Sequence, residues 1–154
     1  MTYAIVDSPV GPLTLVSDEG ALTGLYMDEH RHMPVITGKR DDTVLPEVQE
    51  QLTAYFAREL KEFSLRTSVG GTDFQRRVWA ALVGIPYGET WSYRDLAEHI
   101  GSPKAVRAVG LANGKNPISI VVPCHRVVGA NGSLTGYGGG LANKQLLLDL
   151  ERGL

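Results

Sequence analysis

The chain has 154 residues, of which 43% are hydrophobic and 21% are charged. This size suits one compact domain or two small domains that share a core, and the balance of apolar and charged residues excludes a disordered chain. No apolar run approaches the roughly 18 residues of a membrane-spanning helix, and the first residues lack the basic and apolar regions of a signal peptide.

Cysteine and charge limit the compartment and the partners. A single cysteine cannot form an internal disulfide, so we expect a reducing compartment, the cytoplasm. Because no apolar run is long enough to span a bilayer, we expect no membrane partner. The net charge of −2 alone argues against nucleic acid, but residues 1–70 carry a net −5 and residues 71–154 a net +3. A basic half beside an acidic half can steer DNA to one face.

The first part of the chain predicts a small sheet followed by a helix. Residues 2–7, 12–17 and 21–27 are rich in Val, Ile, Leu, Thr and Tyr and are separated by glycine turns, which is typical of short strands. The polar residues 28–45 predict an exposed loop. A helix should then begin with Pro46 in its first turn. Its apolar face should consist of Val48, Leu52, Tyr55, Phe56 and Leu60.

Gly70-Gly71 indicates a boundary, which gives an expected division into domains 1–70 and 71–154. After the boundary, Thr72 and Gln75 match a capping box for a helix with Phe74, Val78 and Leu82 on its apolar face. Ser92 and Asp95 resemble a looser cap for a short helix that ends before Gly101. Ser102-Pro103 should begin the next helix, which ends near Asn113-Gly114. Two short helices around a glycine turn predict a helix-turn-helix.

The chemistry concentrates in the segment that follows. An apolar run, residues 118–122, leads into Pro123, Cys124, His125 and Arg126; a glycine-rich stretch covers 129–140, and a leucine-rich helix is expected over 141–151. Neighbouring side chains on extended backbone point apart, so His125 reaches Cys124 only through a bridging water or a backbone bend. Glu151 could orient His125 in a Cys–His–carboxylate arrangement. Taken alone, a lone cysteine is more often a small buried core residue.

The segment taken whole resembles a known family. PCHRVVG, preceded by NPISIVV and followed by GYGGG, is similar to the active-site signature of the O6-alkylguanine-DNA alkyltransferases. TDFQRRVWAALVGIPYGETWSYRDLAEHIGSPKAVRAVGLANGKNP resembles that family's helix-turn-helix segment in order and spacing, and SPVGPLTLV fits its N-terminal domain more loosely. The resemblance implies an α/β (α+β) fold: a ribonuclease H-like sheet domain with a helix, then a helical domain with a winged-helix-like helix-turn-helix.

The resemblance also implies roles for matching residues. Cys124 would be the nucleophile and alkyl acceptor, His125 would take its proton through a water, Glu151 would bond to His125, and Asn116 would brace the active-site turn. Tyr93 would help rotate the damaged nucleotide and protonate the leaving guanine, and Arg107 would fill the space of the flipped base. The remaining expected DNA contacts are Ser92, Gly110, Ala112 and Asn113, and the expected pocket residues are Pro123, Val127, Tyr137, Gly138 and Gly139.

The implied reaction is the single-turnover transfer of an alkyl group from O6-alkylguanine, or O4-alkylthymine, in double-stranded DNA to Cys124. The thioether product has no carbonyl for water to attack, so the protein would act only once. The resemblance also implies a monomer that enters the minor groove, flips the damaged base and can bind DNA cooperatively. Gly138 departs from the serine that many members carry there, and we expect the change to be tolerated in a looser loop.

No metal or organic cofactor is expected. The pair His30 and His32 makes a poor tetrahedral zinc set without a cysteine nearby. Two other functions stay open: a non-catalytic DNA-binding module, as in the alkyltransferase-like proteins that lack the cysteine, and a Cys–His hydrolase that turns over without DNA. The presence of Cys124 argues against the first.

Overall fold

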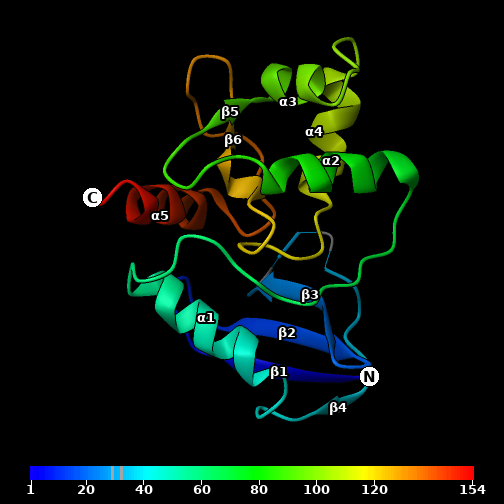
Figure 1. Cartoon of the computed structure of the whole chain (residues 1–154), viewed down its shortest axis with the longest axis vertical. Coiled ribbons are helices and arrows are strands. Elements are labelled where there is room, and N and C mark those ends of the chain that lie inside the picture. The colour runs from blue at the N-terminus through cyan, green and yellow to red at the C-terminus, as the bar shows by residue number, and fades with distance from the viewer. Residues whose placement is uncertain (29, 32) are drawn as a thin grey trace.

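A computed structural model describes residues 1–28, 30–31 and 33–154. It confirms the expected α/β architecture: a small sheet with one helix lies at one end, and a helical part lies at the other (Figure 1). The sheet contains β1 (Thr2–Val6), β2 (Leu13–Asp18) and β3 (Ala21–Met27), close to the predicted strands.

The sheet has the order β3-β2-β1-β4, with antiparallel pairs except for β1 and β4, which are parallel. Strand β4 (Lys39–Arg40) lies in the segment expected to be loop. This expectation was wrong because two charged residues carry no strand signal of their own. They are extended because they pair with Thr2 and Tyr3 of β1, far away in sequence.

Helix α1 (Pro46–Phe56) covers one face of the sheet (Figure 1). It begins at Pro46 as predicted, since proline fits the first helical position, where no backbone donor is needed. Val48, Leu52 and Tyr55 are buried along one side. Leu60 lies beyond the end of the helix, so this part of the predicted apolar face was wrong.

Capping explains where two helices of the second part begin. Thr72 and Gln75 form a capping box at the start of α2 (Asp73–Val83), and Ser92 and Asp95 form another at the start of α3 (Tyr93–His99). The predicted start of the next helix was wrong. Helix α4 (Val106–Gly114) begins after a turn in which the Ala105 amide donates to the Ser102 carbonyl.

The remaining elements connect the two ends of the molecule. Strands β5 (Trp91–Ser92) and β6 (Val127–Val128) form a small parallel pair, a 3₁₀ turn η1 spans Cys124–Arg126, and α5 (Leu141–Glu151) closes the chain. Leu25 of β3 donates to the Pro117 carbonyl at 2.9 Å and accepts from the Ser119 amide at 3.2 Å. The edge of the first sheet therefore supports the turn that leads to Cys124.

Across the described ranges, no helix combines the length and the apolar character needed to cross a bilayer.

Candidate active site

Cys124 opens the 3₁₀ turn η1 and is almost fully buried, at 5% exposure. The apolar run before it is not a strand. It folds into a tight turn in which the Val122 amide donates to the Ile118 carbonyl and the Cys124 amide donates to the Val122 carbonyl. The backbone bend between Cys124 and His125 thus replaces the extended geometry that would point their side chains apart.

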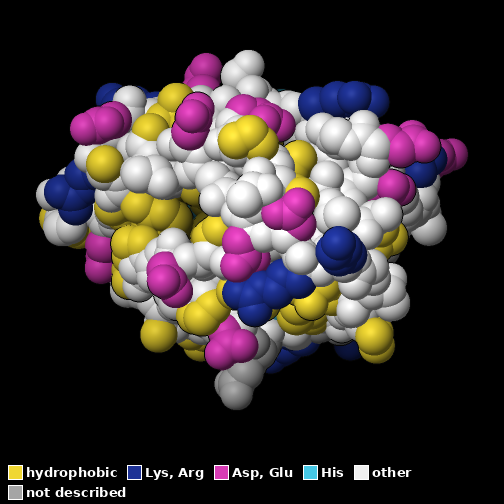
Figure 2. All heavy atoms as spheres, turned by 90° about the horizontal axis from the view of Figure 1, so that it is seen from below, with side chains coloured by type: hydrophobic (Ala, Val, Ile, Leu, Met, Phe, Trp, Pro, Cys, Tyr) yellow, Lys and Arg dark blue, Asp and Glu magenta, His cyan; other side chains and the backbone are white. Residues whose placement is uncertain are grey.

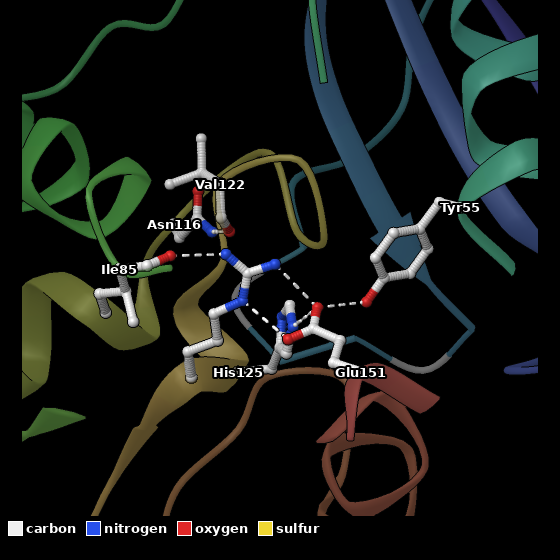
Figure 3. Close-up of polar contacts among 7 residues, drawn as sticks. Tyr55, Ile85, Asn116, Val122, His125 and Glu151 are labelled. Atoms are coloured by element: carbon white, nitrogen blue, oxygen red, sulfur yellow. Dashed lines mark hydrogen bonds and ion pairs between the residues drawn. The ribbon is translucent and has the colours of Figure 1, made fainter. Parts of the chain in front are cut away.

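Asn116 spans this turn with its side chain. Its amide nitrogen donates to the Val122 carbonyl at 2.8 Å (Figure 3), and its side-chain oxygen accepts from the Ile118 amide at 3.0 Å. Ile120, within the turn, has φ of 72°, a left-handed conformation that is strained for a β-branched residue. The bonds of Asn116 compensate for a strained turn and fix the position of the cysteine that follows it.

His125, Arg126 and Glu151 form a buried polar network. Glu151, in the last residue of α5, accepts from His125 Nε2 at 2.8 Å and from Arg126 through two nitrogens at 2.8 and 2.9 Å. Arg126 also donates to the Ile85 carbonyl. Figure 3 shows the carboxylate between His125 and Tyr55, whose hydroxyl lies 2.6 Å from Glu151 Oε2.

This network fixes the tautomer of His125. Hydrogen bonds from His125 and Arg126 lower the pKa of Glu151 to about 2 against the opposing effect of burial. The carboxylate is therefore ionised and can only accept, so the neutral imidazole carries its proton on Nε2. Nδ1 is left as the basic nitrogen. It is buried, and no described residue bonds to it.

Burial sets the resting charge of both reactive groups. It raises the pKa of the Cys124 thiol, against opposing contributions from Asn116, Lys144 and Ser119, so the thiol is protonated at neutral pH. Burial also lowers the pKa of His125, in spite of Glu151, so the imidazole is neutral. The resting site is a thiol beside a neutral base, and nucleophilic thiolate requires transfer of its proton.

Lys144, on α5, is a fully buried cation. Its Nζ donates to the carbonyls of Val127 and Thr135 at 2.5 and 3.0 Å, which ties the glycine-rich loop to β6. Burial lowers the pKa of Lys144 to about 8, although the nearby thiol of Cys124 acts in the opposite direction. Lys144 was not among the predicted site residues, because a lysine in a helix usually reaches solvent.

Because of Lys144, the free energy of unfolding should change with pH in the alkaline range. The unfolded lysine has a pKa near 10.4, so above about pH 8 the unfolded state binds more protons than the folded one. The free energy of unfolding should therefore gain about 2 kcal/mol from this group between about pH 8 and pH 10. Urea unfolding of the protein and of Lys144→Met across this range tests it. Parallel pH curves for the two proteins would exclude the effect.

Of the expected pocket residues, Pro123 adjoins Cys124 in the chain and Tyr137 lies near its thiol. Pro123, Val127 and Tyr137 are buried, and burial followed by the nearby thiol raises the pKa of Tyr137 well above its usual value. The structure also explains Gly138: a Cβ there would lie 2.6 Å from His30 Nε2. Arg31 donates from its amide to the Gly138 carbonyl, so this loop is held by the first part of the chain.

Gly139 is equally confined, since a Cβ there would collide with the sulfur of Met27. Together with Gly138, it allows the pocket loop to lie directly against Met27 and His30. The expectation of a looser loop at Gly138 does not fit this packing.

Helix α4 exposes Arg107, as a DNA contact requires. Leu111, one turn further along the same helix, is 66% exposed and was not among the predicted DNA contacts. Ala112 and Asn113 were expected to contact DNA, but their side chains are buried, at 3% and 2% exposure. Trp79 of α2 donates to the Ala112 carbonyl, so this side of α4 faces the core.

The start of α3 lies against α4. Tyr93 is half-buried, and its ring lies 3.7 Å from where a Cβ on Gly110 would be, an ordinary contact distance that alanine would also allow. The Tyr93 hydroxyl donates to the Thr135 carbonyl at 3.4 Å, and Ser92 caps the helix. Tyr93, Gly110 and the pocket loop therefore adjoin one another.

Of the two histidines that were considered as zinc ligands, His32 lies outside the described residues. His30 accepts from the Met27 amide through Nδ1 at 3.1 Å. Among residues that the structure places, no three His, Cys, Asp or Glu side chains gather as metal ligands would.

Comparison with known proteins identifies the family. The model of the 6-O-methylguanine DNA methyltransferase ribonuclease-like domain matches residues 1–69, and that of the 6-O-methylguanine DNA methyltransferase DNA-binding domain matches residues 73–153. The chain belongs to the 6-O-methylguanine DNA methyltransferase family. The resemblance of the sequence to this family is thereby confirmed.

Members of this family align with almost the whole chain. The methylated-DNA–protein-cysteine methyltransferase of Mycolicibacterium paratuberculosis is 58% identical over 151 residues, which are 97% of this chain and 92% of the relative. That of Methanosarcina acetivorans is 51% identical over 153 residues and 98% of both chains. The crystal structure of Mycobacterium tuberculosis OGT in complex with DNA has a TM-score of 0.96 and 54% identity, covering 99% of this chain and 94% of that one.

Proposed function

We propose that this protein repairs DNA directly by moving the alkyl group of O6-alkylguanine onto its own Cys124. The observation that carries the proposal is the buried thiol beside a neutral imidazole that Glu151 holds in the tautomer with a basic Nδ1. The names of its relatives and the DNA in the matched crystal structure support the substrate.

The chemistry follows from these groups. His125 Nδ1 takes the thiol proton through a water, and the thiolate attacks the alkyl carbon in line with the O6 bond. The sulfur–carbon bond forms as the carbon–oxygen bond breaks, and guanine leaves with a proton from Tyr93. The product is a thioether, which water does not cleave, so each chain acts once. No cofactor takes part, and the thiol requires a reducing compartment, the cytoplasm.

Access to the base requires that the nucleotide leave the duplex, because stacking hides O6. We place the minor groove against α4 and the start of α3, with Arg107 in the space of the flipped base and Ser92, Tyr93 and Gly110 at the backbone. Residues 71–154, which include α3 and α4, carry a net charge of +3, whereas residues 1–70 carry −5, which favours the α3–α4 end as the DNA face. Acidic and basic side chains are mixed over the opposite, sheet end of the molecule (Figure 2). A monomer suffices for this arrangement, and further copies can bind along the same groove.

Intact mass spectrometry after incubation with a duplex that contains O6-methylguanine tests the proposal. The expected result is one added CH₂ per chain, located on Cys124 by peptide mapping, with guanine restored in the DNA. A DNA-binding module would retain DNA without an adduct, and a hydrolase would leave both unchanged. Either result would contradict the proposal.

Arg107→Ala tests the proposal that Arg107 fills the space left by the flipped base. Extrusion of a base costs a few kcal/mol, so loss of the side chain that fills the space should slow repair of duplex by about 30-fold. Reaction with the free base O6-benzylguanine should change by less than about threefold, because no stack is opened. Arg152→Ala removes an exposed charge at the end of α5, outside the proposed DNA face, and serves as the matched control. Equal losses on duplex and free base would remove the role of Arg107.

A further inference from the structure

Tyr55 comes from the first part of the chain, yet it reaches the catalytic network. It lies near the end of α1, is fully buried, and places its hydroxyl 2.6 Å from Glu151 Oε2, 96 residues away in sequence. Figure 3 shows the ring pointing at the carboxylate from the side opposite His125. Every other donor to Glu151 that the structure describes comes from His125 or Arg126.

The direction of this bond is fixed. Glu151 is ionised and accepts only, and burial together with the negative charge of Glu151 raises the pKa of Tyr55, which keeps its proton. Tyr55 is therefore a permanent donor to the same oxygen, Oε2, that receives His125 Nε2. Arg126 Nη2 is the third donor to Oε2, and the Tyr55 hydroxyl restricts the rotation of the carboxylate more than His125 and Arg126 alone would.

Packing holds the phenol in this orientation. Its ring meets Phe56 and Tyr87 edge-on, at 5.2 and 6.3 Å between centroids, and lies 5.4 Å from Phe63. These contacts need only the ring. The hydroxyl adds the bond to Glu151, so its removal separates packing from positioning.

We propose that Tyr55 is a positioning residue for alkyl transfer: its hydroxyl fixes the Glu151 carboxylate that orients His125, so that helix α1 contributes to the catalytic relay. The proposal rests on the proposed function and adds to it a residue outside the sequence signature. A donor on Oε2 also draws negative charge away from the bond to His125. Without it, the carboxylate should stabilise the imidazolium more strongly and raise the pKa of His125.

Several other titratable groups also influence the pKa of His125, and their contacts must be the same in each variant that is compared. Those that face the pair of His125 and Glu151 are Arg126 from η1, Lys144 from α5, Cys124 from η1, Tyr87 from the turn after α2, and Tyr137 from the glycine-rich loop. Tyr55→Phe keeps the ring contact with Tyr87, and it removes no hydrogen bond from any of these groups in the described structure.

The experiment measures single-turnover transfer from O6-methylguanine duplex across pH for the unsubstituted protein, Tyr55→Phe and Tyr26→Phe. Tyr26 is the matched control. It is a buried tyrosine of β3 and makes no hydrogen bond to His125, Arg126 or Glu151 in the described structure. We expect Tyr55→Phe to slow transfer about tenfold and to move the acid limb of the rate profile upward by about half a pH unit. DNA affinity and the control should change less than about twofold. A rate within twofold and an unmoved limb would overturn the proposal.

A double-mutant cycle separates positioning from loss of structure. If Tyr55 acts through Glu151, Tyr55→Phe should slow transfer by less than about twofold in the background of Glu151→Gln. If the two losses multiply in full, Tyr55 acts elsewhere and the proposal fails. All rates are taken in the cold on protein that elutes as folded monomer.

Alkylation of Cys124 by iodoacetamide across pH gives a reading that needs no DNA. The acid limb of this reaction should shift in Tyr55→Phe as it does with duplex. Were the unsubstituted protein to transfer nothing from DNA, the proposed function would fail, while the iodoacetamide profiles would still decide whether Tyr55 tunes His125. Identical profiles for Tyr55→Phe and the unsubstituted protein would overturn the inference alone.

Discussion

Replacing Cys124 by serine is expected to abolish alkyl transfer and to leave DNA binding within about twofold. A serine hydroxyl fits the buried site and can keep the bonds of the turn, but it is a far weaker nucleophile than a thiolate. Loss of the nucleophile should lower the rate by on the order of 10⁴-fold or more. The DNA face on α3 and α4 is untouched, because Cys124 is only 5% exposed.

Intact mass and fluorescence anisotropy measure the two properties on the same preparation. An alkyl adduct on the serine variant would contradict the assignment of Cys124 as the nucleophile. Loss of the lesion from DNA at a rate near that of the unsubstituted protein would contradict it equally. Loss of DNA binding together with transfer would instead show that the substitution disturbed the fold, and the unfolding midpoint of the variant checks this.

Glu151→Gln should have the largest effect on stability. The carboxylate accepts from His125, Tyr55 and two nitrogens of Arg126, and the guanidinium of Arg126 is itself buried. Removing one member of a buried ion pair leaves the other charge uncompensated, which typically costs 3–5 kcal/mol. We expect the free energy of unfolding to fall by about 3 kcal/mol, and transfer by about 100-fold because His125 loses its fixed tautomer.

Urea unfolding and single-turnover kinetics test this variant. Asp149→Asn, two residues earlier on α5, removes a carboxylate that bonds only to the exposed Gln145 in the described structure, and should change stability by less than about 0.5 kcal/mol. A Glu151→Gln protein as stable and as fast as this control would mean that the network carries neither role.

Local signals in the sequence predicted much of the fold. Three local signals were recognisable because each depends on residues close in sequence: the capping pairs at Thr72 and Ser92, the proline at the start of α1, and the strand-forming composition of β1 to β3. The start of α4 was misplaced because Ser-Pro favours a turn as well as a helix start, and here the turn at Ser102 comes first.

Contacts between distant segments were not predictable in this way. Strand β4 exists through pairing with β1, and Tyr55 was assigned only to the core face of a helix because that face is apolar. Ala112 and Asn113 share a short helix with Arg107, but only the packing of α4 on α2 decides which side meets solvent. The resemblance located Cys124, His125 and Glu151, and the structure brings His125 and Glu151 into hydrogen-bond contact next to Cys124.

The contact between His30 and Gly138 links two positions that lie more than a hundred residues apart. A side chain at 138 needs the space that the imidazole occupies. A serine at 138 would therefore require the His30 ring to move or a smaller residue to replace it, so each position limits which substitutions the other can accept.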